Sequence, residues 1–228
     1  MAGRVFAVTG GAGILGSAVV HAAAERGARV ALIDHAKAPP GPAPDGALVL
    51  CGVDLTDANQ AGAAIDQAAD HFGGLDALLN IAGGFAWEKL EGSTGEIWKR
   101  MFLLNVQTAS NASRAAIPHL RRSAAGRIVN VGANAALKAS LGMCAYAASK
   151  AGVHSLTQAL AEELKADGVT VNAVLPSILD TPSNRADMPK ADFAAWVTPQ
   201  DLAAVMLFLA SEEAVAVTGA LIPVTGRV

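Results

Sequence analysis

A glycine-rich turn between a strand and a helix constrains this chain more than any other feature of its sequence. The apolar run Val5–Thr9 precedes Gly11-Ala-Gly13-Ile-Leu-Gly16, where a helical pattern begins. Such glycines allow a tight turn, close approach of the backbone to a pyrophosphate, and close packing of helix on strand. The unpaired N–H groups at the start of a helix favour phosphate oxygens. A turn without a ligand is the alternative. The predicted phosphate-binding residues are Gly10, Gly11, Gly13, Ile14, Leu15 and Gly16.

Strand and helix patterns alternate along the whole chain. The predicted strands are Val5–Thr9, Arg29–Ile33, Ala47–Leu50, Ala77–Asn80, Arg127–Val131, Val169–Leu175 and Ala220–Val224. The predicted helices lie near Gly13–Arg26, Asp57–Phe72, Glu96–Arg121, Ala145–Ala166 and Pro199–Ala210. Apolar strands that alternate with helices are typical of a parallel sheet covered on both faces. The sequence therefore predicts an α/β fold, a single-domain Rossmann-type doubly wound parallel sheet.

Length, charge and cysteine content narrow the class of protein. A chain of 228 residues with 52% hydrophobic residues suits one domain spanning residues 1–228. A net charge of −3 gives no basic excess, so nucleic acid is not an expected partner. Cys51 and Cys144 form neither a metal-binding spacing nor a disulfide framework, so we expect no metal and a reducing compartment. No apolar run approaches the roughly 20 residues that cross a bilayer, and we expect a soluble, cytoplasmic protein with a small-molecule substrate.

A carboxylate at the end of the second predicted strand indicates which dinucleotide binds. Asp34 follows Gly16 by 18 residues, where a carboxylate accepts hydrogen bonds from both hydroxyls of a ribose. Its charge repels a 2′-phosphate, and the neighbouring His35 is mostly neutral at pH 7. We therefore expect the chain to bind NAD(H) in preference to NADP(H). Asp54, with Leu55 beside it, either contacts the adenine or caps the helix that begins near Asp57.

Tyr146 and Lys150 stand four residues apart in a predicted helix, so their side chains share one face. Tyr146 is the only tyrosine of the chain. An ammonium beside a phenol, whose ordinary pKa is about 10, lowers that pKa and brings proton transfer nearer neutrality. Such a phenol can act as general acid when a nicotinamide reduces a carbonyl or an imine. The alternative is two solvated residues on a helix face.

These motifs resemble, in their order along nearly the whole chain, those of the short-chain dehydrogenase/reductases. The resemblance rests on the glycine turn and on a set of later residues: Asn80-Ile-Ala-Gly83, Asn105, Tyr146, Lys150 and Pro176 to Thr181. It implies a homodimer or homotetramer. It also implies that further residues bind the cofactor: Asn80, Ala82, Gly83, Pro176, Ile178 and Thr181.

The same resemblance implies a catalytic group of three residues. Tyr146 acts as the acid, Lys150 holds the nicotinamide ribose, and Asn105 holds a water that relays protons to Lys150. The sequence departs from the mainstream family pattern at two positions. Ile14 stands where a glycine is expected, and Ala133 stands where a serine normally donates a hydrogen bond to the substrate oxygen.

Both departures are similar to one branch of the family, the quinonoid dihydropteridine reductases. The chain resembles that branch in the turn Ala82-Gly-Gly-Phe85, in Gly132-Ala-Asn-Ala-Ala-Leu137, in Val153-His154 and in the segment that begins at Leu179-Asp-Thr-Pro182. The last of these lies in a predicted substrate lid at about residues 177–198. Asn80 and Asn105, by contrast, follow the mainstream family.

Three functions are consistent with these patterns. The first is an NADH-dependent reductase of a quinonoid or imine-like acceptor, which needs no donor at Ala133. The second is a carbonyl or alcohol oxidoreductase in which Asn134 or Ser140 replaces the serine, and the third is a catalytically idle nucleotide sensor. A flat acceptor favours a flat apolar wall, for which Phe85 and Trp196 are the candidates; each has packing as its alternative role.

Overall fold

The computed structural model describes residues 1–228, and its centre is one sheet of seven parallel strands in the order β3-β2-β1-β4-β5-β6-β7. Every strand is largely apolar, and β1 and β4 are buried along their whole length, as expected for a sheet covered on both faces. This confirms the predicted fold class. The strands are β1 (Val5–Thr9), β2 (Arg29–Asp34), β3 (Leu48–Cys51), β4 (Ala77–Asn80), β5 (Arg127–Val131), β6 (Thr170–Pro176) and β7 (Leu221–Val224).

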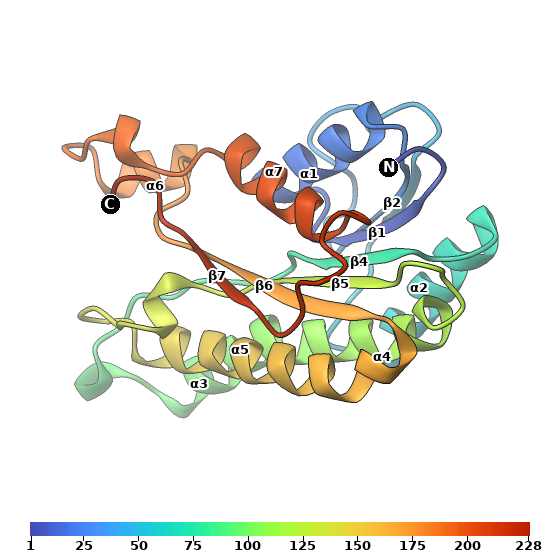
Figure 1. The fold of residues 1–228 in the computed structure, drawn as a ribbon. Coiled ribbons are helices and arrows are strands. Elements are labelled where there is room, and N and C mark those ends of the chain that lie inside the picture. The colour runs from blue at the N-terminus through green and yellow to red at the C-terminus, as the bar shows by residue number, and fades with distance from the viewer.

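Helices form a layer on each face of the sheet, with α1 and α7 on one face and α2, α4 and α5 on the other (Figure 1). The α-helices are α1 (Ile14–Glu25), α2 (Ala58–Phe72), α3 (Gly95–Phe102), α4 (Thr108–Leu120), α5 (Cys144–Leu164), α6 (Pro182–Asp187) and α7 (Pro199–Leu209). The short helical segments are η1 (Leu90–Gly92), the π-helical η2 (Leu103–Gln107), η3 (Asn134–Ala136), η4 (Lys165–Asp167) and η5 (Phe193–Ala195).

Local signals explain where several helices begin and end. The Asp57 carboxylate caps α2 by accepting hydrogen bonds from the N–H groups of Asn59 and Gln60, and Gly73 ends the helix in the left-handed conformation at φ 80°. The Thr198 hydroxyl caps α7, in which Pro199 occupies the first turn. The strands lie within one residue of their predicted bounds, because short apolar runs between such signals are easily recognised.

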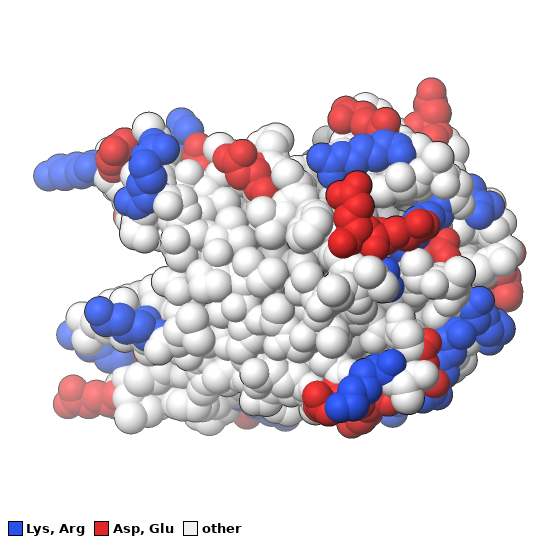
Figure 2. Space-filling model, viewed as in Figure 1, with Lys and Arg blue, Asp and Glu red and all other residues white.

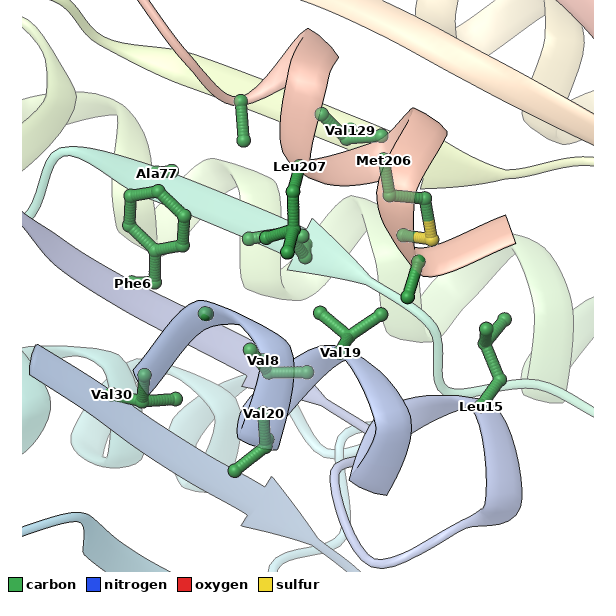
Figure 3. Close-up of a cluster of buried hydrophobic side chains, with 14 of the residues drawn as sticks. Phe6, Val8, Leu15, Val19, Val20, Val30, Ala77, Val129, Met206 and Leu207 are labelled. Carbon is green, nitrogen blue, oxygen red and sulfur yellow. The ribbon is translucent and has the colours of Figure 1, made fainter. Parts of the chain in front are cut away.

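Two hydrophobic clusters hold the helical layers to the sheet. The larger one joins α1 and α7 to β1, β2, β4 and β5 through residues such as Phe6, Val19 and Met206 (Figure 3). The second joins α2, α4 and α5 to the opposite face and includes Ala112 and Ala116. The alanine-rich face of α4 is therefore part of the core within one chain.

The structure departs from the predicted helices at two places. The single helix expected at Glu96–Arg121 is divided into α3 and α4 by the π-helical turn η2, which centres on Asn105. The segment after β6, expected to be an irregular loop, contains the short helix α6, which Thr181 caps by accepting from the Asn184 N–H at 3.2 Å. An ion pair of Arg185 with Asp180, at 2.6 Å, holds this helix to the chain before it. No helix is long and apolar enough to cross a membrane.

Two buried arginines connect the amino ends of the strands to the carboxyl end of α7. Arg4, just before β1, donates to the carbonyl oxygens of Ala210 and Ala125, at 2.6 Å each. Arg127, the first residue of β5, donates from Nε to the Ser211 oxygen at 3.0 Å and from Nη1 to the Gly126 oxygen at 2.8 Å. Both cations face carbonyls at a helix end, where the helix dipole favours positive charge.

We expect Arg127→Met to destabilise the protein by about 2–4 kcal/mol, because buried carbonyls lose their donors and the helix end loses a cation. The free energy of unfolding measured in urea tests this. Arg29→Met is the matched control, because Arg29 also donates to backbone oxygens, those of Gly3 and Phe72, but is exposed. Equal losses in the two variants would contradict this role for Arg127.

Candidate active site

A cavity of about 920 Å³ lies at the carboxyl ends of β1, β2, β3 and β4. The molecule is also visibly hollowed between the lobe that holds α6 and the lobe below it, where α3 lies (Figures 1 and 2). The cavity lining comes from the glycine turn after β1, from the ends of β2, β3 and β4, from the segment that runs from α3 to α4, and from Leu179 after β6. Among its residues are Gly10, Gly13, Ile14, Leu15, Gly16, Asp34, Asp54, Leu55, Ala82, Gly83, Arg100, Leu104 and Leu179.

The glycine turn packs so closely that three of its residues, Gly10, Gly11 and Gly16, have no room for a side chain. Gly10 has φ +65°, and a Cβ there would lie 2.8 Å from the Ala82 nitrogen. A Cβ at Gly16 would collide with the Gly10 carbonyl oxygen. Ile14, which stands where the mainstream pattern has glycine, projects outward and is about half exposed. Gly11 is buried against Leu32, beneath the cavity, and is not part of its lining.

Asp34 stands in the cavity with its carboxylate already oriented by the backbone. Its Oδ2 accepts from the Ala12 N–H at 2.9 Å, and its Oδ1 accepts from the Ala36 N–H at 2.8 Å. Each carboxylate oxygen has a second lone pair, so both can still accept from two hydroxyl groups of a ligand. His35 lies beside it in the lining.

Asp54 does not cap α2, because Asp57 does. The Asp54 Oδ1 instead accepts from the N–H and the hydroxyl of Thr56, at 2.9 and 2.7 Å. Hydrogen bonds from Thr56 hold the pKa of Asp54 below its usual value. The helix-cap interpretation is therefore wrong, and Asp54 is a charged residue at the end of the cavity that Leu55 and Thr56 also line.

The segment after β4 is attached to the end of β1 by a single hydroxyl. Thr9 Oγ1 accepts from the N–H groups of Ile81 and Ala82, at 3.1 and 3.3 Å. Ala82 and Gly83 line the cavity as expected, whereas Asn80 lies beneath it. The Asn80 Nδ2 donates to Asn130 Oδ1 and Ser113 Oγ, at 2.8 and 3.0 Å, and thus links the sheet to α4.

Asn105 lies in the π-helical turn and connects three segments of the site. Its Oδ1 accepts from the Gly84 N–H, and its Nδ2 donates to the Gly84 carbonyl, both at 3.0 Å. The second Nδ2 hydrogen is donated to Ser149 Oγ of α5 at 2.9 Å. Both amide hydrogens are thus in use, and the side chain links Gly84 to α5. π-Helical turns are frequent at functional sites.

Tyr146 and Lys150 lie on α5 beyond the lining of the cavity, and Lys150 comes close to Gly83. A Cβ at Gly83 would lie 3.5 Å from Lys150 Nζ, which places the ammonium at the edge of the cavity. Lys150 Nζ donates to the Val131 carbonyl at 2.7 Å. The Tyr146 ring meets the Phe85 ring edge-on at a centroid distance of 4.9 Å.

Burial dominates the protonation of this pair. It raises the pKa of Tyr146 to about 12 and lowers the pKa of Lys150 to about 8, because a low-dielectric environment disfavours both charged forms. Desolvation therefore outweighs any lowering of the phenol's pKa by the charge of Lys150. Tyr146 is a protonated phenol at neutral pH, which makes it a proton donor.

The candidate substrate residues differ in their exposure. Phe85 is 53% exposed beside Tyr146, whereas Trp196 is only 6% exposed and packs on Phe193 at a centroid distance of 4.8 Å. The packing role therefore describes Trp196. Ala133 is buried at 3% exposure, in extended backbone just before η3, so no hydroxyl group occupies the serine position.

The lid residues lie beside the cavity, and one of them lines it. Leu179 belongs to the lining, while Pro176, Ile178 and Thr181 do not. The Ile178 carbonyl accepts from the Val197 N–H at 3.1 Å, which ties the start of the lid to its end. Sequence reasoning missed several lining residues, including Arg100, Leu104 and Thr108; the last two are four residues apart and hence on one helix face.

The site as a whole combines a cavity for an extended ligand with a proton donor. The cavity offers N–H groups of a helix start at one place and a carboxylate at another, which fits the phosphates and a ribose of a dinucleotide. The half-buried phenol and the buried ammonium lie beyond the lining, with the ammonium beside Gly83. This arrangement suits hydride transfer coupled to proton transfer.

Comparisons with known proteins agree with this geometry. A family model for short chain dehydrogenase matches residues 4–192. The chain is 34% identical to 2,5-dichloro-2,5-cyclohexadiene-1,4-diol dehydrogenase from Sphingobium indicum, over 99% of this chain and 96% of the relative.

Two solved structures have the same fold over almost the entire chain. The ligand-free aldohexose dehydrogenase of Thermoplasma acidophilum has a TM-score of 0.88 at 28% identity, covering 98% of this chain and 93% of that one. Carveol dehydrogenase from Mycobacterium avium, in complex with NAD, has a TM-score of 0.86 at 27% identity, covering 99% and 97%. The chain belongs to the short-chain dehydrogenase/reductase family and is an oxidoreductase.

Proposed function

We propose that this chain is an NAD(H)-dependent oxidoreductase that interconverts a small, largely apolar alcohol and its carbonyl compound. The observation that carries the proposal is Tyr146, a half-buried phenol beside Phe85 whose pKa of about 12 keeps it protonated at neutral pH. The names of two similar proteins, a cyclohexadienediol dehydrogenase and carveol dehydrogenase, support an alcohol as one form of the substrate.

In the direction of reduction, a bound nicotinamide supplies the hydride. The substrate carbon accepts that hydride while the C=O double bond becomes a C–O single bond, and Tyr146 Oη donates its proton to the oxygen. Lys150 is placed to stabilise the resulting phenolate by its charge, and its pKa of about 8 means that most of it is an ammonium at pH 7. Oxidation of the alcohol reverses each step. Phe85 offers the flat apolar wall against which a ring can lie.

A preference for NAD(H) over NADP(H) is part of the proposal. The Asp34 carboxylate stands in the cavity with lone pairs free for two ribose hydroxyls, and its charge opposes a 2′-phosphate. The solved structure of the similar carveol dehydrogenase with NAD supports the same preference.

A quinonoid or imine-like acceptor is the second candidate, and Ala133 favours it. A simple ketone develops charge on one oxygen in the transition state, and the loss of one donor there costs about 3 kcal/mol by analogy with an oxyanion hole. A quinonoid ring spreads that charge over several atoms, so it depends less on the missing hydroxyl. The similarity of the lid to that of the quinonoid dihydropteridine reductases is further support.

Tyr146→Phe removes only the acidic hydroxyl. We expect kcat to fall at least a hundredfold, about 2.7 kcal/mol, while NADH binds as before because the ring remains. Steady-state oxidation of NADH with a panel of cyclic ketones, diketones, quinones and quinonoid dihydropterin measures kcat, and a fluorescence titration measures the Kd of NADH. A variant that keeps more than about a tenth of the wild-type kcat would refute the acid role of Tyr146.

Asp34→Ser removes the charge that opposes a 2′-phosphate. We expect the wild-type protein to have the larger kcat/KM with NADH, and the variant to reduce or reverse that preference. The control is Asp45→Ser, which changes an exposed carboxylate in the loop after β2 and should leave the ratio unaltered. Equal use of NADPH and NADH by the wild-type protein would contradict the assignment.

Ala133→Ser distinguishes the two acceptor classes. For a simple ketone the new hydroxyl supplies a hydrogen bond worth about 1–3 kcal/mol in the transition state, so kcat/KM should rise at least about fivefold. For a quinonoid or imine-like acceptor kcat/KM should stay within a few-fold. Ala136→Ser, three residues further in η3, is the control. If wild-type protein reduces simple ketones rapidly and Ala133→Ser has no effect, another group supplies the donor and the second candidate is excluded.

A further inference from the structure

His154 is a buried imidazole that the proposed chemistry does not use. It lies on α5 one helical turn after Lys150 and is 6% exposed. Its Nε2 lies 3.3 Å from the Ala133 nitrogen, which donates a hydrogen bond to it. The imidazole therefore contacts the backbone of the residue that stands at the serine position.

The contact leaves no space for a side chain on the preceding residue. A Cβ at Gly132 would lie 2.5 Å from His154 Nε2 and 3.4 Å from Leu175 Cδ1. The glycine thus lets the imidazole reach the backbone after β5. Because the Ala133 N–H is the donor, Nε2 must carry a lone pair, so His154 is in its neutral form with the proton on Nδ1.

Two residues of α5 hold the segment after β5 from the same side. Lys150 Nζ donates to the Val131 carbonyl, and His154 Nε2 accepts from the Ala133 N–H. Lys150 is also the residue expected to hold the nicotinamide ribose.

We propose that neutral His154 is a positioning residue of the active site, whose Nε2 lone pair fixes the backbone of Ala133 against α5 and whose protonation releases it. The proposal rests on the proposed function, because Ala133 matters for catalysis only if the substrate is reduced beside it. An imidazolium would place an N–H group against the Ala133 N–H and add a second positive charge close to Lys150.

The surroundings of His154 give the direction of its pH dependence. Burial lowers the pKa of His154, and the charge of Lys150 on the same helix lowers it further. The neighbours of its ring carry no charge: they are Leu175 of β6, and Gly132 and Ala133 after β5. Since the folded state favours the neutral imidazole, the stability that it contributes is present above pH 6.5, the ordinary pKa of histidine, and is lost as the pH falls below that value. Activity should be lost only as the pH falls through the lowered pKa of His154 in the folded protein.

Two substitutions separate positioning from packing. His154→Gln keeps an acceptor that does not titrate, and it should retain at least a third of the wild-type kcat at pH 7.5 and lose the acid limb of the kcat profile. His154→Leu keeps the bulk but has no acceptor, and it should lose kcat at least tenfold while the Kd of NADH changes less than threefold. His71→Gln, an exposed histidine on α2, is the control and should match the wild type. An unchanged acid limb in His154→Gln, or wild-type kcat in His154→Leu, would overturn the proposal.

An NMR titration tests the contact without any substrate. In the wild-type protein the Ala133 amide resonance should shift with the same midpoint as the His154 imidazole, and that shift should be absent in His154→Gln. If the chemical shift of the Ala133 amide does not change as His154 titrates, the proposal is overturned, even if His154→Leu fails to fold. If the midpoints coincide but no acceptor in the panel oxidises NADH, the proposed function fails while the positioning contact stands.

Discussion

The reversal of strand order between β1 and β4 is the constraint on which the rest of the structure depends. The chain leaves β1 toward α1 on one face of the sheet, and the elements after β4 lead to α4 on the other face (Figure 1). Two adjacent strands whose connections diverge leave a crevice at their carboxyl ends. Thr9 links the two strands at this crevice, because its hydroxyl oxygen accepts hydrogen bonds from the first two N–H groups after β4. The cavity, the glycine turn and Asp34 all lie around this point.

Most of the fold and the dinucleotide half of the site could be predicted, because their signals are local. An apolar run between turn residues is enough to recognise a buried strand, as for Val5–Thr9 and Arg127–Val131. The close approach of Gly10 and Gly16 follows from their spacing after β1. Asp34 lies in the cavity because it ends the neighbouring strand. Each of these inferences needs only a short stretch of sequence that includes one strand and the turn after it.

The remaining features depend on contacts between distant segments. The π-helical turn at Asn105 is stabilised by Gly84 and Ser149, which lie 21 and 44 residues away, so the helical pattern alone predicts a continuous helix. From the sequence Trp196 is either a flat wall for a substrate or a packing residue, and only its exposure of 6% identifies the packing role. The role of Asp54 was ambiguous because two aspartates stand three residues apart before α2, and only the structure shows which one caps it.

Burial also explains why the pKa of Tyr146 could not be predicted from its spacing to Lys150. Four residues on a helix bring a phenol and an ammonium to one face, but the sign of the net effect depends on how much water each group retains. In this structure desolvation raises the pKa of the phenol and lowers that of the ammonium, because burial disfavours the charged form of each group. A positive charge near the phenol, such as that of an oxidised nicotinamide ring, would favour the phenolate. The same buried pair would then act as a proton donor beside the reduced coenzyme and as a proton acceptor beside the oxidised one, which is what a reversible oxidoreductase requires.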